Sequence, residues 1–292
     1  MNRIIDLEFI TPLFSHGATD DPEVRPSSIR GTLHEWFRLL GGDIVSERRV
    51  FGGIKQKNAT YKDHDVTAAS SVVVRVADVK GKSVEFPTLP HKSGGRAAPR
   101  KAFLAGTTCR VMLSSRFSEM LDEDERRFSS SLNAWLLMGT LGYRATRAAG
   151  SFVWRDAAFE MPMERLEYED ACRNLLDECD ASKNVKIAVL DVPYSTSEEA
   201  RRIVSDSLGG PERNGQYDLR DLHDPLGRIF GGRKTSPLKY RIVKLESGFH
   251  ILALWDNRSS VTGNRESDFY GVIDLLERKK PRLGEQLKKA FW

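Results

Sequence analysis

The sequence lacks several features that would assign it to a class at once. It contains only three cysteines, Cys109, Cys172 and Cys179, an odd number that argues against a disulfide framework. They form no CxxC pair and have no neighbouring histidine, so we expect buried thiols rather than a zinc site. No run of eighteen or more apolar residues is present, and the first residues have the pattern of a strand rather than of a signal peptide. These absences predict a cytoplasmic protein that does not span a membrane.

Catalytic signatures are also missing from the contexts that would support them. There is no P-loop, no GxGxxG in a strand–turn–helix setting, no nucleophile elbow and no Ser-His-Asp order. Asp63, His64 and Asp65 are the best candidate metal ligands, but neighbours on one polar loop need a third ligand from elsewhere. We therefore predict no catalytic residue, no metal site and no cofactor.

Charge is nearly balanced along the whole chain. The 292 residues include 45 Lys and Arg against 41 Asp and Glu, and a net charge of +4 says little about partners. The placement of charge is more informative, because arginines gather near glycine-rich segments while acidic residues cluster in 119–125 and 164–180. This asymmetry predicts a basic surface apart from an acidic one.

Periodicity predicts an α+β fold. Period-two alternation predicts strands at 3–11, 72–76, 107–114, 152–159, 185–192, 238–245 and 248–255. Helical spacing of apolar residues predicts helices at 27–40, 122–141, 167–178, 266–279 and 282–291. We expect an exposed insertion at 52–69, a flexible basic loop at 87–101 and irregular structure or short elements over 193–234. The order predicts two ferredoxin-like (βαββαβ, RRM-like) domains, residues 1–160 and a degenerate copy at 161–292.

Five segments together resemble one family. They are FITPLFSHGA at 9–18, RPSSIRGTLHEWFR at 25–38, ERRVFG at 47–52, LGYRATRAAGSF at 141–152 and SPL at 236–238. These resemble the RAMP superfamily and, within it, the first subunits of the Cmr effector complex, a type III-B CRISPR ribonucleoprotein. The fourth segment resembles the glycine-rich loop of the superfamily, although Ala145, Ala148 and Ala149 stand where glycines are usual.

The resemblance implies what the chain binds. It implies ferredoxin-like domains that hold crRNA or target RNA near the 3′ end of the guide, beside other Cmr-type effector subunits, with no nuclease activity in this subunit. It also implies that the glycine-rich loop lies against the first helix, so that Arg30, Arg38, Arg144 and Arg147 would form one patch.

Arginine suits phosphate because its guanidinium donates two parallel hydrogen bonds. The predicted RNA-binding residues are Arg25, Arg30, His34, Arg38, Arg48, Arg49, Lys55, Lys57, Arg144, Arg147, Arg233 and Lys234. The alternative is a set of solvated faces and loops, with Glu35 as an ion-pair partner on the first helix. A second basic cluster, with the same two interpretations, comprises His91, Lys92, Arg96, Arg100 and Lys101.

Other interpretations remain open for particular residues. Trp36 and Phe37 suit base stacking, but their spacing with Ile29 and Leu33 predicts the core instead. An alternative function is a RAMP-type endoribonuclease that processes precursor crRNA, with His16, His34 or His64 as general acid or base. A further alternative is cleavage of target RNA by a loop aspartate and a divalent metal.

Overall fold

The computed structural model describes residues 2–53, 69–116, 120–207, 226, 235–263 and 265–291. Its strands are β1 (Asn2–Phe9), β2 (Val72–Lys80), β3 (Ser83–Pro87), β4 (Pro99–Phe103), β5 (Thr108–Ser115), β6 (Phe152–Asp156), β7 (Val185–Val189), β8 (Leu238–Leu245) and β9 (Gly248–Asp256). Its helices are α1 (Pro26–Leu39), α2 (Ile44–Phe51), α3 (Asp122–Met138), α4 (Arg165–Glu178), α5 (Ser197–Ser207), α7 (Ser259–Thr262), α8 (Glu266–Lys279) and α9 (Pro281–Phe291).

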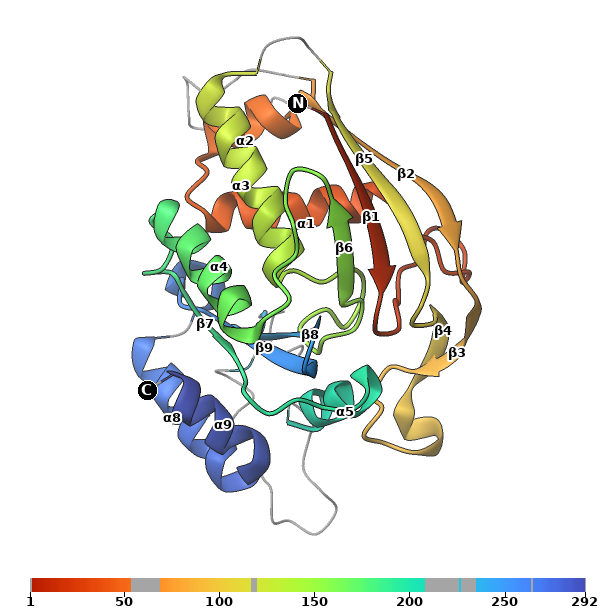
Figure 1. The fold of residues 1–292 in the computed structure, drawn as a ribbon, viewed down its shortest axis with the longest axis vertical. Coiled ribbons are helices and arrows are strands. Elements are labelled where there is room, and N and C mark those ends of the chain that lie inside the picture. Colours follow the sequence, from red (N-terminus) through yellow and green to blue (C-terminus); the bar gives the residue numbers. More distant parts are fainter. Residues whose placement is uncertain are drawn as a thin grey trace.

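The first sheet is antiparallel, with the strand order β2-β5-β1-β6. Alternation along β1 buries Ile5, Leu7 and Phe9, whereas Asp6 and Glu8 point to the opposite, exposed face. Helices α1 and α3 lie on one side of this sheet, and their apolar residues share one core with β1 and β5 (Figure 1). The strand alternation therefore decides which face of the sheet the helices cover.

The segment 87–101, which was predicted to be a flexible loop, contains the connection of the β3–β4 hairpin: residues 88–98 join the two strands, and 99–101 begin β4. Thr88 is 1% exposed, and its hydroxyl donates to a backbone carbonyl across the hairpin at 2.9 Å. Phe86 and Ala102 pack against Phe14, which belongs to a distant part of the sequence. The loop prediction is therefore confirmed for 88–98, and it differs from the structure at 99–101 because the strand partner and Phe14, which order these residues, lie outside the segment.

The second sheet is antiparallel, with the order β7-β9-β8, and both of its faces are buried. Val243 and Leu252 face the core shared with the first sheet, and Ile242 and Ile251 face a second core that contains residues of α5, α8 and α9. Two buried faces explain why β9 is apolar without interruption over 251–255.

Arg241 connects the two sheets from within the core. It lies on β8 and is fully buried, and its guanidinium donates to the carbonyl oxygens of Trp135, Gly139 and Phe152. The first two carbonyls end α3, where the partial negative charge of the helix dipole favours a cation. The guanidinium also stacks on the Phe152 ring, 4.4 Å from its centroid.

The edge of β7 that faces away from β9 is covered by side chains of α4. Arg165 and Arg173 donate to the carbonyl oxygens of Val189 and Ile187, at 3.0 and 3.2 Å. Glu169 accepts from the Val189 amide at 3.2 Å. Spacing by four places these three side chains on one face of α4, so one helix supplies hydrogen bonds that a neighbouring strand would otherwise make.

The α+β class and most of the predicted elements are confirmed, including the β8–β9 hairpin, in which Leu245 pairs with Gly248. Differences concern the ends: the helix predicted over 122–141 ends at Met138, because Gly139 is extended. Helices α2 and α5 were not predicted. The predicted domain boundary near 160 falls between β6 and α4, and it stays a prediction. Among the described helices, none combines the length and apolarity needed to cross a lipid bilayer.

Candidate nucleic-acid interface

The predicted row on α1 faces α2. Arg30 donates to the carbonyl oxygen of Phe51, the last residue of α2. Arg38 donates to both carboxylate oxygens of Glu47 at 2.9 Å, and Nδ1 of His34 lies 2.5 Å from the same carboxylate. The ring of His34 stacks on Phe51, with centroids 3.9 Å apart. All three side chains therefore have partners within the protein.

The charges in this contact are set by burial and pairing. Burial alone would raise the pKa of Glu47, but hydrogen bonds from Arg38 and His34 together lower it, so the carboxylate is ionised at neutral pH. Burial lowers the pKa of His34, and this effect outweighs the attraction of Glu47. His34 is thus a neutral imidazole at pH 7, and Glu47 balances the charge of Arg38.

Arg49 also has a structural partner. It binds Asp124 of α3 through two hydrogen bonds, at 2.6 and 2.9 Å, and the Asp124 carboxylate is 1% exposed. Arg48 is partly buried on the same helix and also has an interaction within the protein. Arg49 therefore holds α2 against α3, and RNA binding by Arg48 and Arg49 stays a prediction.

The aromatic pair of α1 lies in the core, as predicted. Phe37 is fully buried and Trp36 is 7% exposed. Phe37 meets Phe51 edge to face, with ring centroids 5.5 Å apart. Neither ring offers a face on which a base could stack.

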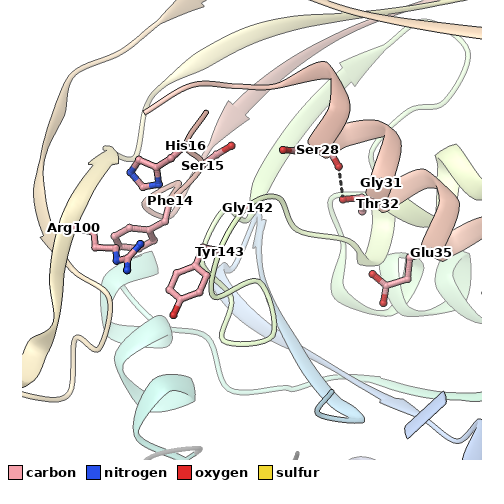
Figure 2. Close-up of a pocket in the computed structure, with 10 residues that line it drawn as sticks. All are labelled: Phe14, Ser15, His16, Ser28, Gly31, Thr32, Glu35, Arg100, Gly142 and Tyr143. Carbon is pink, nitrogen blue, oxygen red and sulfur yellow. Dashed lines mark hydrogen bonds between the residues drawn. The ribbon is translucent and has the colours of Figure 1, made fainter. Parts of the chain in front are cut away.

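A pocket of about 490 Å³ lies between α1 and the glycine-rich loop (Figure 2). Its lining comprises Phe14, Ser15, His16, Ser28, Gly31, Thr32, Glu35, Arg100, Gly142 and Tyr143. The four α1 residues are spaced by three and four and form one helix face. That face is not the one that carries Arg30 and Arg38. The predicted patch of four arginines is therefore not what lines this pocket.

Tyr143 is the exposed aromatic side chain of the pocket. It is 46% exposed, and the guanidinium carbons of Arg100 and Arg144 lie 5.5 and 5.0 Å from its ring centroid. The backbone amide of Tyr143 donates to the carbonyl oxygen of Phe14 at 2.6 Å, which fixes the loop against the segment that follows β1. Gly142 has φ +87°, and a Cβ there would lie 2.5 Å from the Phe14 carbonyl oxygen. The fold thus requires glycine before this tyrosine.

The two loop arginines have different surroundings. Arg144 has φ +64° and turns its guanidinium back onto Tyr143. Arg147 is more buried, and burial followed by the charge of Arg144 lowers its pKa to about 10. It forms an isolated bridge with Tyr240 at the start of β8, so the second sheet holds this end of the loop. Of the pair, Arg144 is the one beside the pocket ring.

Arg25 borders the pocket through His16, whose carbonyl oxygen it contacts at 3.1 Å. Nε2 of His16 donates to the carbonyl oxygen of Lys101 at 2.8 Å. The remaining predicted contacts, Lys55, Lys57, Arg233 and Lys234, lie outside the described residues, as do Asp63, His64 and Asp65. Within the part of the chain that is described, no three His, Cys, Asp or Glu side chains converge on a metal position.

Sequence reasoning missed three residues of this site. Arg100 was assigned to a separate basic cluster, but the β3–β4 hairpin carries it to Tyr143. Tyr143 was quoted only as part of a motif, and Gly31 was taken as an ordinary helix residue. A glycine inside a strongly periodic helix and an aromatic residue directly after a loop glycine were the available signals.

Comparisons with known proteins show the family of this chain. A family model of the RAMP superfamily matches residues 6–153, which include α1, the β3–β4 hairpin and the glycine-rich loop. The CRISPR system Cmr subunit Cmr1-2 of Pyrococcus furiosus is 30% identical over 172 residues, which cover 51% of this chain and 92% of that protein. Subunit Cmr1-1 of the same organism is 26% identical over 178 residues, which cover 53% of this chain but only 50% of that protein.

Solved structures share the fold over most of the chain. The apo crystal structure of Cmr1 from Pyrococcus furiosus superposes with a TM-score of 0.59 at 18% identity, covering 88% of each chain. A chain of the type III-B Cmr-beta complex bound to cognate target RNA gives 0.53 at 11% identity, covering 88% of this chain and 94% of that one. A further state of that complex gives 0.56 at 12% identity, covering 94% and 98%.

Proposed function

The chain belongs to the RAMP superfamily and is a Cmr1-like subunit of the type III-B CRISPR kind, and on this basis we propose that it is a non-catalytic RNA-binding subunit of the effector ribonucleoprotein. Its partners would be crRNA, target RNA near the 3′ end of the guide, and other Cmr-type subunits. A structural relative of this chain belongs to a type III-B Cmr-beta complex that is bound to cognate target RNA, which supports this assignment.

The observation that carries the proposal is Tyr143, a pocket residue that is 46% exposed and has the guanidinium carbons of Arg100 and Arg144 at 5.5 and 5.0 Å from its ring centroid. Aromatic faces stack bases, and guanidinium groups bind the phosphates between them. The exposed face of the first sheet offers no such platform, because the outward residues of β1, β5 and β6 include Asp6, Arg110 and Arg155 but no aromatic side chain. RNA would therefore run along the pocket between α1 and the loop rather than over the sheet.

The ferredoxin-like interpretation belongs with this proposal. The succession β1-α1-β2-β5-α3-β6, with order β2-β5-β1-β6, supports a βαββαβ unit into which α2 and the β3–β4 hairpin are inserted. The succession β7-α5-β8-β9-α8, with order β7-β9-β8, supports a second unit that lacks its last strand. Division into residues 1–160 and 161–292 would follow these units, although α4 packs in the core of the first.

The non-catalytic role rests on how the described histidines are used. His34 is held by Glu47 and Phe51 on the far side of α1 from the pocket. His16 lines the pocket, and this observation favours the endoribonuclease alternative, in which His16 would act as general acid or base. Its Nε2 is engaged by the Lys101 carbonyl oxygen, which leaves only Nδ1 for chemistry.

The test is incubation of the chain with labelled precursor crRNA and target RNA, with and without magnesium, read by gel shift and by product length. Retarded, intact RNA is expected. Arg100→Ala and Arg144→Ala should each weaken binding and reduce the log–log salt slope by about 0.7 per lost phosphate contact. Arg126→Ala is the matched control, because Arg126 is an exposed arginine on α3. Cleavage that disappears in His16→Ala would establish the enzyme instead.

A further inference from the structure

The pocket between α1 and the glycine-rich loop has two chemically different walls. Arg100 and Tyr143 line the side that we call the loop wall, and Gly31, Thr32 and Glu35 line the facing side on α1 (Figure 2). The guanidinium carbon of Arg144 lies 5.0 Å from the Tyr143 ring centroid and adds a second cation beside the loop wall. We infer that the pocket holds one nucleotide of a single RNA strand, with its base on Tyr143, its phosphate toward Arg100 and Arg144, and its ribose against Gly31. This inference rests on the proposed function and adds the orientation of the strand.

Gly31 is a glycine that the fold itself does not require. It lies inside α1 at an exposed position, its φ is not in the left-handed region, and a Cβ there would meet nothing within 4 Å. Glycine in a helix interior lowers the folding equilibrium constant by about fivefold relative to alanine. Gly142 differs, since its positive φ and the nearby Phe14 carbonyl exclude a side chain. Gly31 therefore destabilises the helix although neither the backbone nor the packing requires a glycine there. Because it lines a pocket, its presence indicates close approach by a ligand.

The helix wall presents acceptors rather than cations. The Thr32 hydroxyl donates to the Ser28 carbonyl oxygen at 3.1 Å, so its outward lone pairs accept. Glu35 is about half exposed and is paired with Lys239 of β8. A carboxylate repels phosphate but accepts a hydrogen bond from a ribose hydroxyl. The phosphate therefore belongs on the arginine wall, and the 2′-hydroxyl, which distinguishes RNA from DNA, belongs on the helix wall.

The loop wall is rigid enough to act as a stacking platform. The Tyr143 amide is bonded to Phe14, and Leu141 and Gly150 are joined by a hydrogen bond of 3.0 Å across the base of the loop. The ring is therefore already in place before the base arrives, and little ordering cost opposes stacking. Loss of one base–aromatic stack lowers affinity by about five- to a hundredfold.

The experiment compares Gly31→Ala with Gly271→Ala. Gly271 is also exposed inside a helix, α8, and a Cβ there meets nothing within 4 Å, but it lines none of the pockets described. Both variants should be at least as stable as the parent in urea unfolding. Binding of a labelled oligouridylate should fall about tenfold or more for Gly31→Ala and be unchanged for Gly271→Ala. Tyr143→Ala should also weaken binding, whereas Tyr143→Phe should not.

A second probe, oligodeoxyuridylate of equal length, distinguishes an error in the placement of the ribose from an error in the proposed function. The parent should prefer the RNA, and Gly31→Ala should reduce that preference. If the parent binds oligouridylate and Gly31→Ala binds it equally well, the nucleotide subsite is refuted while the proposed function stands. Equal affinity of the parent for the two oligonucleotides would overturn the placement of the ribose. If the parent binds no RNA at all, the proposed function fails and the subsite fails with it.

Discussion

Replacement of Arg241 by alanine should destabilise the protein by about 4–8 kcal/mol. The guanidinium is fully buried and donates to three carbonyl oxygens. Trp135 keeps its bond from the Gly139 amide at 2.9 Å, so two carbonyl oxygens lose this donor. Each costs about 1–3 kcal/mol when left unsatisfied. The cavity left by the side chain adds about 2 kcal/mol, by analogy with large-to-small core changes.

Urea unfolding measures this free energy, followed by tryptophan fluorescence and by far-UV circular dichroism to check that both report one transition. Arg241→Met fills the volume without restoring the donors, so it should recover the cavity contribution and remain destabilised by about 2–6 kcal/mol. Lys244→Ala lies on the same strand at an exposed position and should change stability by less than about 0.5 kcal/mol. A loss below about 1 kcal/mol for Arg241→Ala would refute the bridging role of this arginine.

Two further predictions concern ionisable groups whose roles the structure assigns to folding. Arg49→Ala leaves the buried Asp124 carboxylate unpaired, so the free energy of unfolding in urea should fall by about 3 kcal/mol. Part of this loss should be recovered when Asp124→Asn is added. Unchanged stability together with lost RNA binding would instead make Arg49 an RNA contact. Burial lowers the pKa of His91 to about 4 from 6.5, so the folded state binds fewer protons than the unfolded state. Stability should therefore fall by about 2 kcal/mol, after allowance for partial exposure, as pH drops from 6.5 to 4. His91→Gln should remove that part of the pH dependence, and identical pH profiles of the two proteins would contradict it.

The sequence pattern predicted those helices and strands whose apolar periodicity lies within the segment itself. The alternation of β1 and the apolar face of α1 depend on residues within each segment, and both elements occur as expected. The β3–β4 hairpin and α2 depend on partners elsewhere, Phe14 for the hairpin and Asp124 for the helix. Such dependence is invisible to a window of neighbouring residues.

The candidate site shows the same division. Spacing alone placed Arg30, His34 and Arg38 on one face of a helix, and they do share a face. The spacing did not reveal that Glu47 of another helix pairs with His34 and Arg38 and balances the charge of Arg38, or that Arg30 donates to the Phe51 carbonyl oxygen. Conversely, Arg100 is distant from Tyr143 in sequence, and only the hairpin brings them together. The sequence therefore indicates the type of ligand better than the residues that hold it.

The row of Arg165, Glu169 and Arg173 on α4 has a consequence for assembly. An open sheet edge is a template for strand addition, through which chains aggregate or exchange segments. Outward-facing backbone groups of Ile187 and Val189 are already engaged by these side chains, so an incoming strand would have to displace charged hydrogen bonds. The β7 edge of the smaller sheet is thus protected from strand addition, and contacts with neighbouring subunits should use other surfaces.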